Sequence, residues 1–453
     1  MSPPDPPRLL EPLFSTDRMR AILGDRGALQ GMLDFEAALA RAEARQGIIP
    51  EAAATAIAAQ CKAETFDMAE LAYGAALAGN LAIPMVKTLT ALVARTDRDA
   101  AQFVHWGATS QDAIDTGLVL RLRDGLNLIE SDLAHLADTL AQLAAAHAST
   151  LLVGRTLMQQ AAPITFGLKA AGWLSALNRH RERLRELRPR LLVLQFGGAA
   201  GALASFGDQG IAVASALAEE LSLTLPDLPW HGHRDRIAEV ATTLGLLVGA
   251  LGKVMRDISL MMQTEVGEAF EPAGPGRGGS SSMPHKRNPI SSAVVLAAAL
   301  RVPALVSVML TAMVQEHERG LGGWHAEWET LPEICMLTAG ALAHLIQVMD
   351  GLEIDVARMR ENLDHTGGLI LSEAVTLALA KHLGRPEARE LIEEAIGRAR
   401  DEGRALRDML GDEPRVTEYL SVRDLDQLLD PRNYLGSTEQ LVGRVLATHA
   451  ADR

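Results

Sequence analysis

A long leucine seam in the first half of the chain restricts its fold more than any other feature. Between Asp115 and His147 no proline interrupts the sequence, and large aliphatic residues recur at steps of three and four. These residues are Leu118, Leu122, Leu126, Ile129, Leu133, Leu136, Leu140 and Leu143. This spacing places all of them on one face of a helix, as in helices that pack into bundles. We therefore expect a long bundle helix over 115–147.

Further helical patterns extend over most of the remaining sequence. Long ones cover 163–187, 234–268, 290–318 and 328–350, and long helices with short connections predict an antiparallel bundle. Shorter helices are expected over 27–46, 51–62, 68–78 and 84–95, and again beyond about residue 356. The prediction is an all-α fold in which an elongated central antiparallel bundle (113–355) is flanked by an N-terminal helical domain (1–112) and a small C-terminal helical domain (356–453). Little or no sheet is expected.

Composition and charge argue against some kinds of binding partner and indicate the compartment in which the protein works. The 43 basic and 57 acidic residues give a net charge of -14, which argues against nucleic acid or an anionic membrane as partner, because both need a basic face. Cys61 and Cys335 are the only cysteines, so no disulfide scaffold is expected and a reducing compartment fits. The first residues lack a basic and then apolar leader pattern. These features predict a cytoplasmic protein.

One apolar segment, residues 293–314, is long enough to span a bilayer and carries Arg301 as its only charge. Arg301 and Pro303 lie near its centre, and the remaining chain reads as soluble. Because a helix that is apolar on all sides is expected deep inside a large bundle, we expect a buried central helix here.

The most unusual segment is AGPGRGGSSSMPHKRNP, residues 273–289, between two long helical patterns. Gly274, Gly276 and Gly279 formally match G-x-G-x-x-G, but no strand precedes them, so a dinucleotide site is discounted. A glycine-rich loop here brings three serines, Lys286 and Arg287 to a helix N-terminus, which favours anions. We expect Asn288 to cap that helix. A solvated linker between two helices is the alternative reading.

Residues 279–289 resemble the GSSxMPxKxNP signature of the fumarase/aspartase superfamily and match it at every specified position. Two other stretches agree with this resemblance: HWGATSQD (105–112) is similar to the superfamily's first region, whose Thr-Ser pair binds a substrate carboxylate, and GRTLMQQAAPITFG (154–167) is similar to its second region. The resemblance covers essentially the whole chain. It implies a homotetramer whose active sites each combine the three regions from three different subunits.

Leu157 departs from the superfamily pattern. Lyases of the superfamily typically carry a histidine at this position, which acts as general acid toward the leaving group, and leucine cannot transfer a proton. General acid help is worth about a hundred- to ten-thousand-fold in rate. An amine, with a pKa of about 10, needs that help far more than a carboxylate, with a pKa of about 4. Leu157 therefore argues against an adenylosuccinate lyase and for a reaction in which a carboxylate adds or leaves.

One branch of the superfamily fits this departure. The stretch GWHAEWE (323–329) resembles a motif of the 3-carboxy-cis,cis-muconate cycloisomerases, which add a substrate carboxylate across a double bond to make a lactone. This resemblance implies a small polycarboxylate substrate from aromatic catabolism and no metal or organic cofactor. Two alternatives stay open. One is a β-eliminating lyase of the adenylosuccinate or nitrosuccinate type, and the other is a helical scaffold that has lost activity. The intact signature loop speaks against the scaffold.

The resemblance also implies roles for individual residues. Ser280 would exchange the proton at the carbon next to a substrate carboxylate, and Ser281 would hydrogen-bond the developing aci-carboxylate. Because free serine is a weak acid and base, Ser280 needs nearby positive charge and N–H groups. The residues expected to hold substrate carboxylates are Lys286 and Asn288, then Thr109, Ser110 and Gln111 from a second subunit, and Gln159 from a third.

Several histidines have more than one reading. His325 either faces the substrate, as the branch motif implies, or lies at a subunit interface. His105 either braces the Thr109 segment or touches substrate. His231 and His233 lack an acidic or cysteine partner at metal-ligand spacing, so we read them as loop histidines and expect no metal site.

Overall fold

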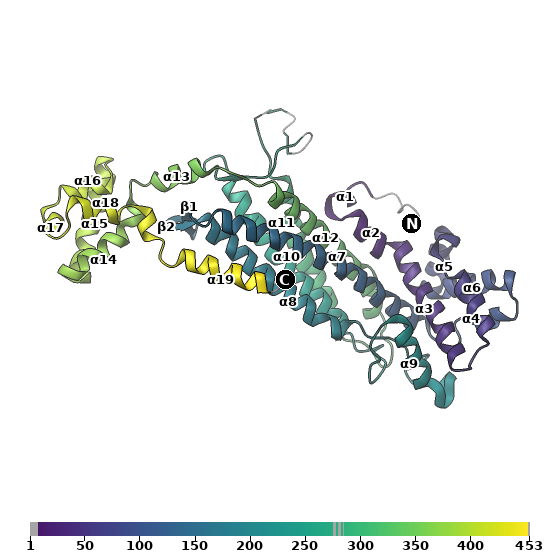
Figure 1. Ribbon diagram of the computed structural model, residues 1–453. Helices are drawn as coiled ribbons and strands as arrows, with labels where there is room; N and C mark the ends of the chain where they lie inside the picture. The colour runs from purple at the N-terminus through teal and green to yellow at the C-terminus, as the bar shows by residue number, and fades with distance from the viewer. Residues whose placement is uncertain (1–7, 275–277, 280–281, 284, 452–453) are drawn as a thin grey trace. The chain divides into compact units, whose positions relative to one another are not determined.

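A computed structural model describes residues 8–274, 278–279, 282–283 and 285–451, and it is predominantly helical (Figure 1). The prediction of an all-α fold is confirmed. The chain divides into two compact units. The first comprises Met1–Ala134, His180–Gly252 and Ala293–Leu345, and the second His135–Arg179, Lys253–Ser292 and Ile346–Arg453. The predicted domains 1–112, 113–355 and 356–453 stay a prediction.

The first unit contains the short helices of the N-terminal part. These are α1 (Glu11–Phe14), α2 (Asp17–Leu23), α3 (Asp25–Arg45), α4 (Glu51–Gln60), α5 (Met68–Ala78), α6 (Ala82–Thr96) and α9 (Gly210–Leu221), with the 3-10 helices η1 (Ala63–Thr65), η2 (Ala100–Phe103) and η3 (Ala204–Gln209). The four short helices expected from the sequence are confirmed, and α5 has the predicted bounds. The sequence analysis missed α9.

Five long helices contribute segments to both units. They are α7 (Ser110–Ala146), α8 (Phe166–Leu191), α10 (Asp235–Met261), α11 (Ile290–Thr311) and α12 (Gly323–Asp350). Polar contacts join neighbouring helices inside each unit: Arg188 of α8 pairs with Glu130 of α7 in the first unit, and Trp173 of α8 donates to Asp257 of α10 in the second. Every seam residue except Leu143 is buried. The five predicted long helices are thus confirmed, with shifted ends.

The second unit holds an antiparallel hairpin that the sequence analysis did not expect. Strand β1 (Leu151–Thr156) pairs with β2 (Gln159–Thr165), and Leu152 lies opposite Ile164. The predicted helix start at Pro163 is wrong, because Pro163–Thr165 belong to β2 and α8 begins at Phe166. A second, two-residue pair joins β3 (Ala269–Phe270) and β4 (Glu353–Ile354). The predicted helix 234–268 ends early, at Met261, and turns connect it to β3.

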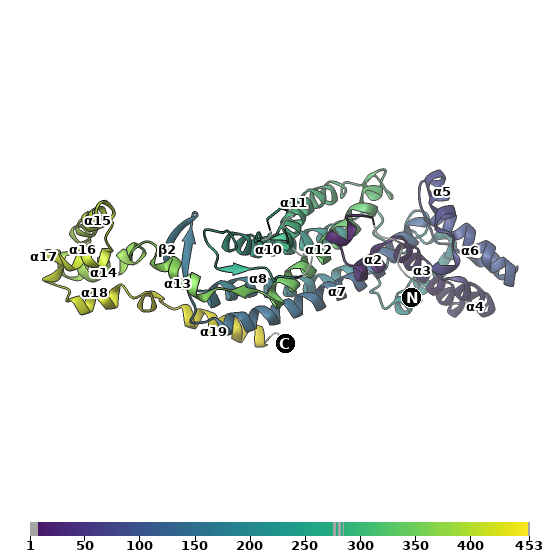
Figure 2. The ribbon, with the colours of Figure 1, turned by 90° about the horizontal axis from the view of Figure 1, so that it is seen from above.

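The C-terminal part of the second unit is built from short helices. They are α13 (Val356–Asp364), α14 (Ser372–Leu383), α15 (Arg385–Glu402), α16 (Leu406–Gly411), α17 (Pro414–Thr417), α18 (Val422–Leu428) and α19 (Thr438–Ala451), with the 3-10 helices η4 (Leu369–Leu371) and η5 (Pro431–Tyr434). Helices α14–α18 gather around one apolar core that includes Leu391 and Leu410 (Figure 2). Short helices were expected here.

Three helices of the described chain, α10, α11 and α12, are long and apolar enough to cross a membrane by length and composition. In α11 only 28% of the apolar window is buried, against 56% in α10 and 61% in α12. Leu300 on α11 is 80% exposed, and Val308 and Leu310 are also exposed. One chain by itself therefore leaves an apolar face of α11 uncovered, and the expected burial of this helix deep in a large bundle stays a prediction.

Candidate active site

The predicted carboxylate-binding segment directly precedes helix α7 in the first unit. Thr109 and Ser110 are half-buried. The backbone N–H of Thr109 donates to Oδ2 of Asp112 at 3.0 Å, so the carboxylate of the third helical residue holds the residue before the helix, as in one half of a capping box. This contact fixes the two hydroxyl-bearing residues at the positive end of the α7 dipole.

Gln111 is fully buried, and all its polar groups contact protein. Its Nε2 donates to Asp115 and to the carbonyl oxygen of His231, both at 3.0 Å. Its Oε1 accepts from Nε of Arg319 at 3.0 Å, and Arg319 also donates to the carbonyl oxygen of Ala199. Gln111 was predicted to bind substrate; the contact it makes here holds a half-buried arginine beside the Thr109 segment.

Asp115 is the centre of a buried ionic network behind this segment. Arg234 donates to both oxygens of Asp115, at 2.7 and 3.1 Å, and to Glu327, at 2.5 and 3.0 Å. Burial opposes the charge of Arg234, but the two carboxylates outweigh it and raise the pKa of the guanidinium. Burial raises the pKa of Glu327 despite this ion pair. Breaking such a pair on one side leaves an uncompensated buried charge, which is strongly destabilising.

The predicted branch motif lies next to this network. Nε1 of Trp324 donates to Oδ1 of Asp115 at 3.0 Å, so the first turn of α12 and the start of α7 share one carboxylate. The following residue, His325, is exposed, and its ring lies 4.5 Å from that of Trp328, centroid to centroid. The structure therefore brings Thr109, Ser110, Gln111 and the residue before His325 into one part of the first unit. An exposed ring is compatible both with a His325 that faces the substrate and with one that lies at a subunit interface.

His105 and His231 both contact buried carboxylates. Nδ1 of His105 lies 2.5 Å from Oε1 of Glu36 on α3. Burial lowers the pKa of His105, but the charge of Glu36 outweighs it, so the net shift is upward. Nε2 of His231 lies 2.7 Å from Oδ1 of Asp112. His231 is buried whereas His233 is exposed, so the reading of both as plain loop histidines missed the partner of His231.

The second region forms the β1–β2 hairpin of the second unit. Leu157 and Met158 make its two-residue turn, with φ of 51° and 65°, which is the left-handed region that glycine and asparagine usually occupy in such turns. Leu157 is 96% exposed and Met158 71%. Gln159 follows the turn and is exposed. Arg155, two residues before the turn, forms a bidentate pair with the fully buried Glu268, at 2.6 and 2.7 Å, which fixes the hairpin to its own unit.

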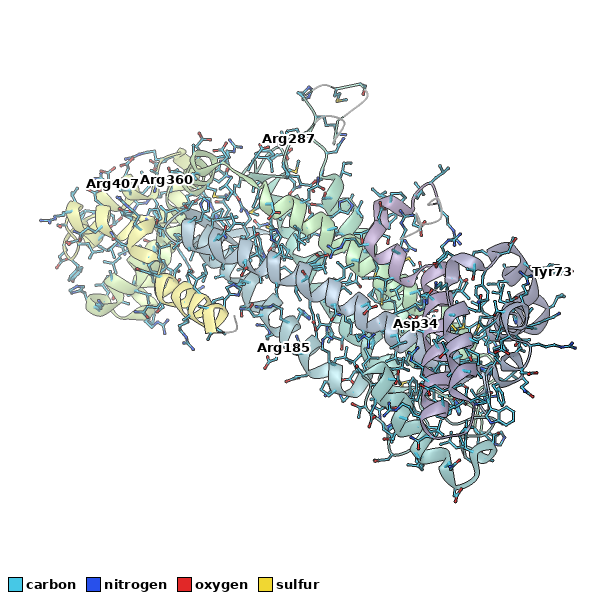
Figure 3. All side chains as sticks on the ribbon, turned by 45° about the vertical axis from the view of Figure 1, so that its right-hand side comes forward. Asp34, Tyr73, Arg185, Arg287, Arg360 and Arg407 are labelled. Atoms are coloured by element: carbon cyan, nitrogen blue, oxygen red, sulfur yellow. The ribbon has the colours of Figure 1, made fainter. Side chains whose placement is uncertain are left out.

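The predicted catalytic residues Ser280 and Ser281 lie outside the described residues. Lys286 is exposed and Asn288 is half-buried, in the second unit. Arg287, labelled in Figure 3, donates to both carboxylate oxygens of Glu353, at 2.8 and 2.9 Å, and to the carbonyl oxygen of Glu271. This pairing lowers the pKa of Glu353. The stretch that leads into α11 is therefore tied to β4.

The predicted capping of α11 by Asn288 gives way to a different arrangement. The carboxylate of Glu271 accepts from the backbone N–H groups of Ser291 and Ser292, at 3.0 and 2.8 Å, and from the Ser292 hydroxyl. A buried carboxylate thus occupies the first turn of the helix. The backbone N–H of Asn288 donates to the carbonyl oxygen of Gly278. No sequence signal indicates Glu271 as a cap, because it precedes α11 by a whole loop.

The site residues predicted from sequence are divided between the two units. Thr109, Ser110, Gln111 and His325 lie in the first, and Gln159, Lys286 and Asn288 lie in the second. Arg319 was not predicted as a site residue, since it lies in a connection between α11 and α12 that carries no sequence pattern. Among the residues that the structure describes, no three His, Cys, Asp or Glu side chains are grouped to hold a metal ion.

Comparison with known proteins places the chain in a family. The model of the lyase family matches residues 14–304, and the model of the adenylosuccinate lyase C-terminus matches residues 368–445. The chain belongs to the fumarase/aspartase superfamily. Within the superfamily, it is 59% identical to the 3-carboxy-cis,cis-muconate cycloisomerase of Pseudomonas aeruginosa over 98% of this chain and 97% of that protein.

A solved structure of a lactonizing enzyme and a lyase with a different named activity are also similar to this chain. The crystal structure of the 3-carboxy-cis,cis-muconate lactonizing enzyme from Pseudomonas putida matches with a TM-score of 0.94 at 57% identity, over 98% of this chain and 99% of that one. The nitrosuccinate lyase of Streptomyces davaonensis is 42% identical, over 97% of this chain and 94% of its own length. The superfamily resemblance drawn from the motifs is thus confirmed over nearly the whole chain.

Proposed function

We propose that this chain is a 3-carboxy-cis,cis-muconate cycloisomerase. The observation that carries the proposal is its 59% identity, across 98% of its length, to a protein of that name. In this reaction a carboxylate of the substrate attacks a double bond of the same molecule and closes a lactone ring. A proton is added to the carbon next to another carboxylate, so atoms and charge balance without a leaving group.

The chemistry of Leu157 supports this proposal. Its side chain stands almost fully exposed at the turn of the β1–β2 hairpin, where superfamily lyases typically carry the general-acid histidine. A lactonization expels no amine and needs no acid for a leaving group. Leucine at this position is therefore compatible with full activity in a cycloisomerase, whereas an amine-expelling lyase would lose the contribution of about a hundred- to ten-thousand-fold that a general acid makes.

The proposed roles of the site residues follow from this chemistry. Ser280 delivers the proton to carbon, and Ser281 hydrogen-bonds the carboxylate that takes up charge as the proton moves. The residues that hold substrate carboxylates are Thr109, Ser110, Gln159, Lys286, Asn288 and His325. Gln111 acts on the substrate through Arg319, which it orients by a hydrogen bond. A polycarboxylate needs several such anchors, each worth more when partly withdrawn from water.

The proposed assembly is a homotetramer with shared active sites, working in the cytoplasm in the protocatechuate branch of the β-ketoadipate pathway. Two exposed apolar surfaces support it: the Leu157–Met158 turn of the second unit, and the face of α11 that carries Leu300 and Val308 in the first. Monomeric soluble proteins rarely leave large contiguous apolar patches uncovered, so a second copy of the chain is the proposed cover.

The Ser280→Ala variant tests the proposed chemistry. We expect it to lower kcat for 3-carboxy-cis,cis-muconate by at least about a hundred-fold, because proton delivery to carbon in the transition state is lost. Turnover is followed by the loss of the diene absorbance. Ser282→Ala, a change of the same size at the unspecified position of the signature loop, is the matched control and should stay within about three-fold of the wild type. Near-normal turnover by Ser280→Ala would show that Ser280 has no such role.

A second candidate function is a β-eliminating lyase with a weakly basic leaving group. The 42% identity to the nitrosuccinate lyase favours it, because such a leaving group also departs without a protonating histidine. The two candidates differ in product: the lyase reaction releases a small group and leaves an alkene, whereas the cycloisomerase consumes one double bond and releases nothing.

A further inference from the structure

We propose that Asp112 and His231 form a positioning pair that holds the Thr109–Ser110 segment in place for a substrate carboxylate. This inference rests on the proposed function, which makes Thr109 and Ser110 carboxylate ligands. Neither Asp112 nor His231 touches substrate in this proposal. They act through the segment that does.

The carboxylate of Asp112 has no exposed surface, and it is surrounded by donors. Oδ2 accepts from the backbone N–H groups of Thr109, at 3.0 Å, and Gly198, at 2.9 Å. Oδ1 accepts from Nε2 of His231 at 2.7 Å, from the backbone N–H of Gly197 at 3.0 Å, and from Nε2 of Gln195 at 3.3 Å. An ionised carboxylate accepts about four hydrogen bonds, so these donors saturate it.

A helix cap alone would not require this arrangement. A capping carboxylate needs only the contact with the backbone N–H before the helix, which here uses part of Oδ2. Oδ1 accepts hydrogen bonds from the 195–198 segment and from His231. Asp112 therefore joins three separate stretches of the first unit: the Thr109 segment, residues 195–198 and residue 231. The position of Thr109 is determined by all of them together.

Charge gives a second reason for the pair. Asp112 lies three residues after Thr109, so its negative charge stands close to the place where a substrate carboxylate is proposed to bind. Like charges at such short range repel strongly when solvent is excluded. The ring N–H of His231 and the three backbone N–H groups point their positive ends at this carboxylate, which partly offsets its repulsion of an anion at the helix N-terminus.

His231 also supports the neighbouring cation. Its carbonyl oxygen accepts from Nε2 of Gln111, whose Oε1 holds Arg319. The side chain of His231 thus fixes Asp112, and its main chain fixes Gln111. Both contacts reach the first turn of α7 from the same residue, and a shift of His231 would move Thr109 and Arg319 together.

The test compares two substitutions of His231. His231→Phe keeps the bulk of the ring but removes the donor, and we expect it to raise KM for 3-carboxy-cis,cis-muconate about ten-fold, with kcat within about three-fold of the wild type. His231→Gln restores an N–H donor and should bring KM back to within about three-fold. The matched control is His449→Phe, because His449 is another buried histidine with an aspartate partner, Asp138, at 2.9 Å. It should lower the melting temperature and leave KM unchanged.

A double substitution separates positioning from general destabilisation. If the pair acts through the segment, His231→Phe should raise KM by about three-fold instead of ten-fold in a Ser110→Ala background, since one of the two ligands that it positions is already gone and Thr109 remains. A full ten-fold increase there, or no rescue by His231→Gln, would overturn the inference.

Calorimetric binding of propane-1,2,3-tricarboxylate gives a readout independent of turnover, and its Kd should follow the same pattern. A wild type that binds this probe without lactonizing the substrate would contradict the proposed function alone. Tricarboxylate binding that is absent from the wild type, or equal in all variants, would overturn the inference itself.

Discussion

At the scale of single residues, the first unit contains a buried acid with no hydrogen-bond partner. Glu43 on α3 has no exposed surface, and neither of its carboxylate oxygens is hydrogen-bonded in the described structure. Burial, and then the charge of Glu36 two helical turns earlier, raise the pKa of Glu43 from 4.5 to about 9. The folded chain therefore keeps this carboxyl protonated at neutral pH, whereas the unfolded chain ionises it.

This difference predicts how stability changes with pH. Between pH 4.5 and about 9 the folded state holds a proton that the unfolded state releases, so the free energy of unfolding falls as pH rises through this window. Glu43→Gln removes the titrating group. We expect equal stability of the two proteins near pH 5, and an advantage of the variant of about 4 kcal/mol near pH 8.5. Urea unfolding at both pH values measures this, and Glu64→Gln on the exposed surface is the control. A constant difference between wild type and Glu43→Gln at both pH values would contradict the assignment.

The residues around Thr109 show which features of the site can be predicted from the sequence and which cannot. The Thr-Ser pair was predicted because it belongs to a contiguous motif. Asp112 was quoted as part of the same motif, but its contact with His231 was not foreseen, since the partner lies far along the chain. Arg234 and Arg319 were missed for the same physical reason: their partners are set by tertiary packing, and no spacing in the sequence encodes them.

At the scale of elements, helices were predictable and the hairpin was not. A period of three and four identified α7, because that period follows directly from helix geometry, whereas α11 was predicted as a long apolar segment. The β1–β2 hairpin has strands of 6 and 7 residues. Its turn is formed by leucine and methionine instead of the asparagine and glycine that mark such turns, so neither alternation nor turn chemistry revealed it. The apolar sequence of α11 predicts a covered helix, but hydrophobicity does not show whether the cover comes from the same chain or from another copy.

The exposed face of α11 makes a prediction about assembly. If a second copy covers it, Leu300→Glu places a charge in an apolar interface and should dissociate the tetramer into smaller species, since an unpaired buried charge is strongly unfavourable. Light scattering after size exclusion gives the mass. Leu9→Glu is the matched control, because Leu9 is also an exposed leucine and no assembly role is proposed for it. A tetramer that withstands Leu300→Glu, or a monomeric wild type, would rule out this interface.

At the scale of the whole molecule, one chain divides its proposed site residues between two compact units. Thr109 and Ser110 belong to the first, and Gln159, Lys286 and Asn288 to the second. The motifs alone were enough to name these residues and the superfamily, because each motif is contiguous and specific. How the three regions would meet in the proposed homotetramer has no counterpart in the sequence of one chain, since contacts between subunits depend on folded surfaces, and Ser280 and Ser281 lie outside the described residues.

A comparison of three substrates with the wild-type protein decides whether this chain is a cycloisomerase or a lyase. Purified protein is mixed with 3-carboxy-cis,cis-muconate, nitrosuccinate or adenylosuccinate, and absorbance is recorded together with the identity of the product. We expect a lactone from the muconate, with kcat/KM exceeding that for either other substrate by at least about a hundred-fold. Rapid elimination from nitrosuccinate or adenylosuccinate, with no lactone formed from the muconate, would contradict it.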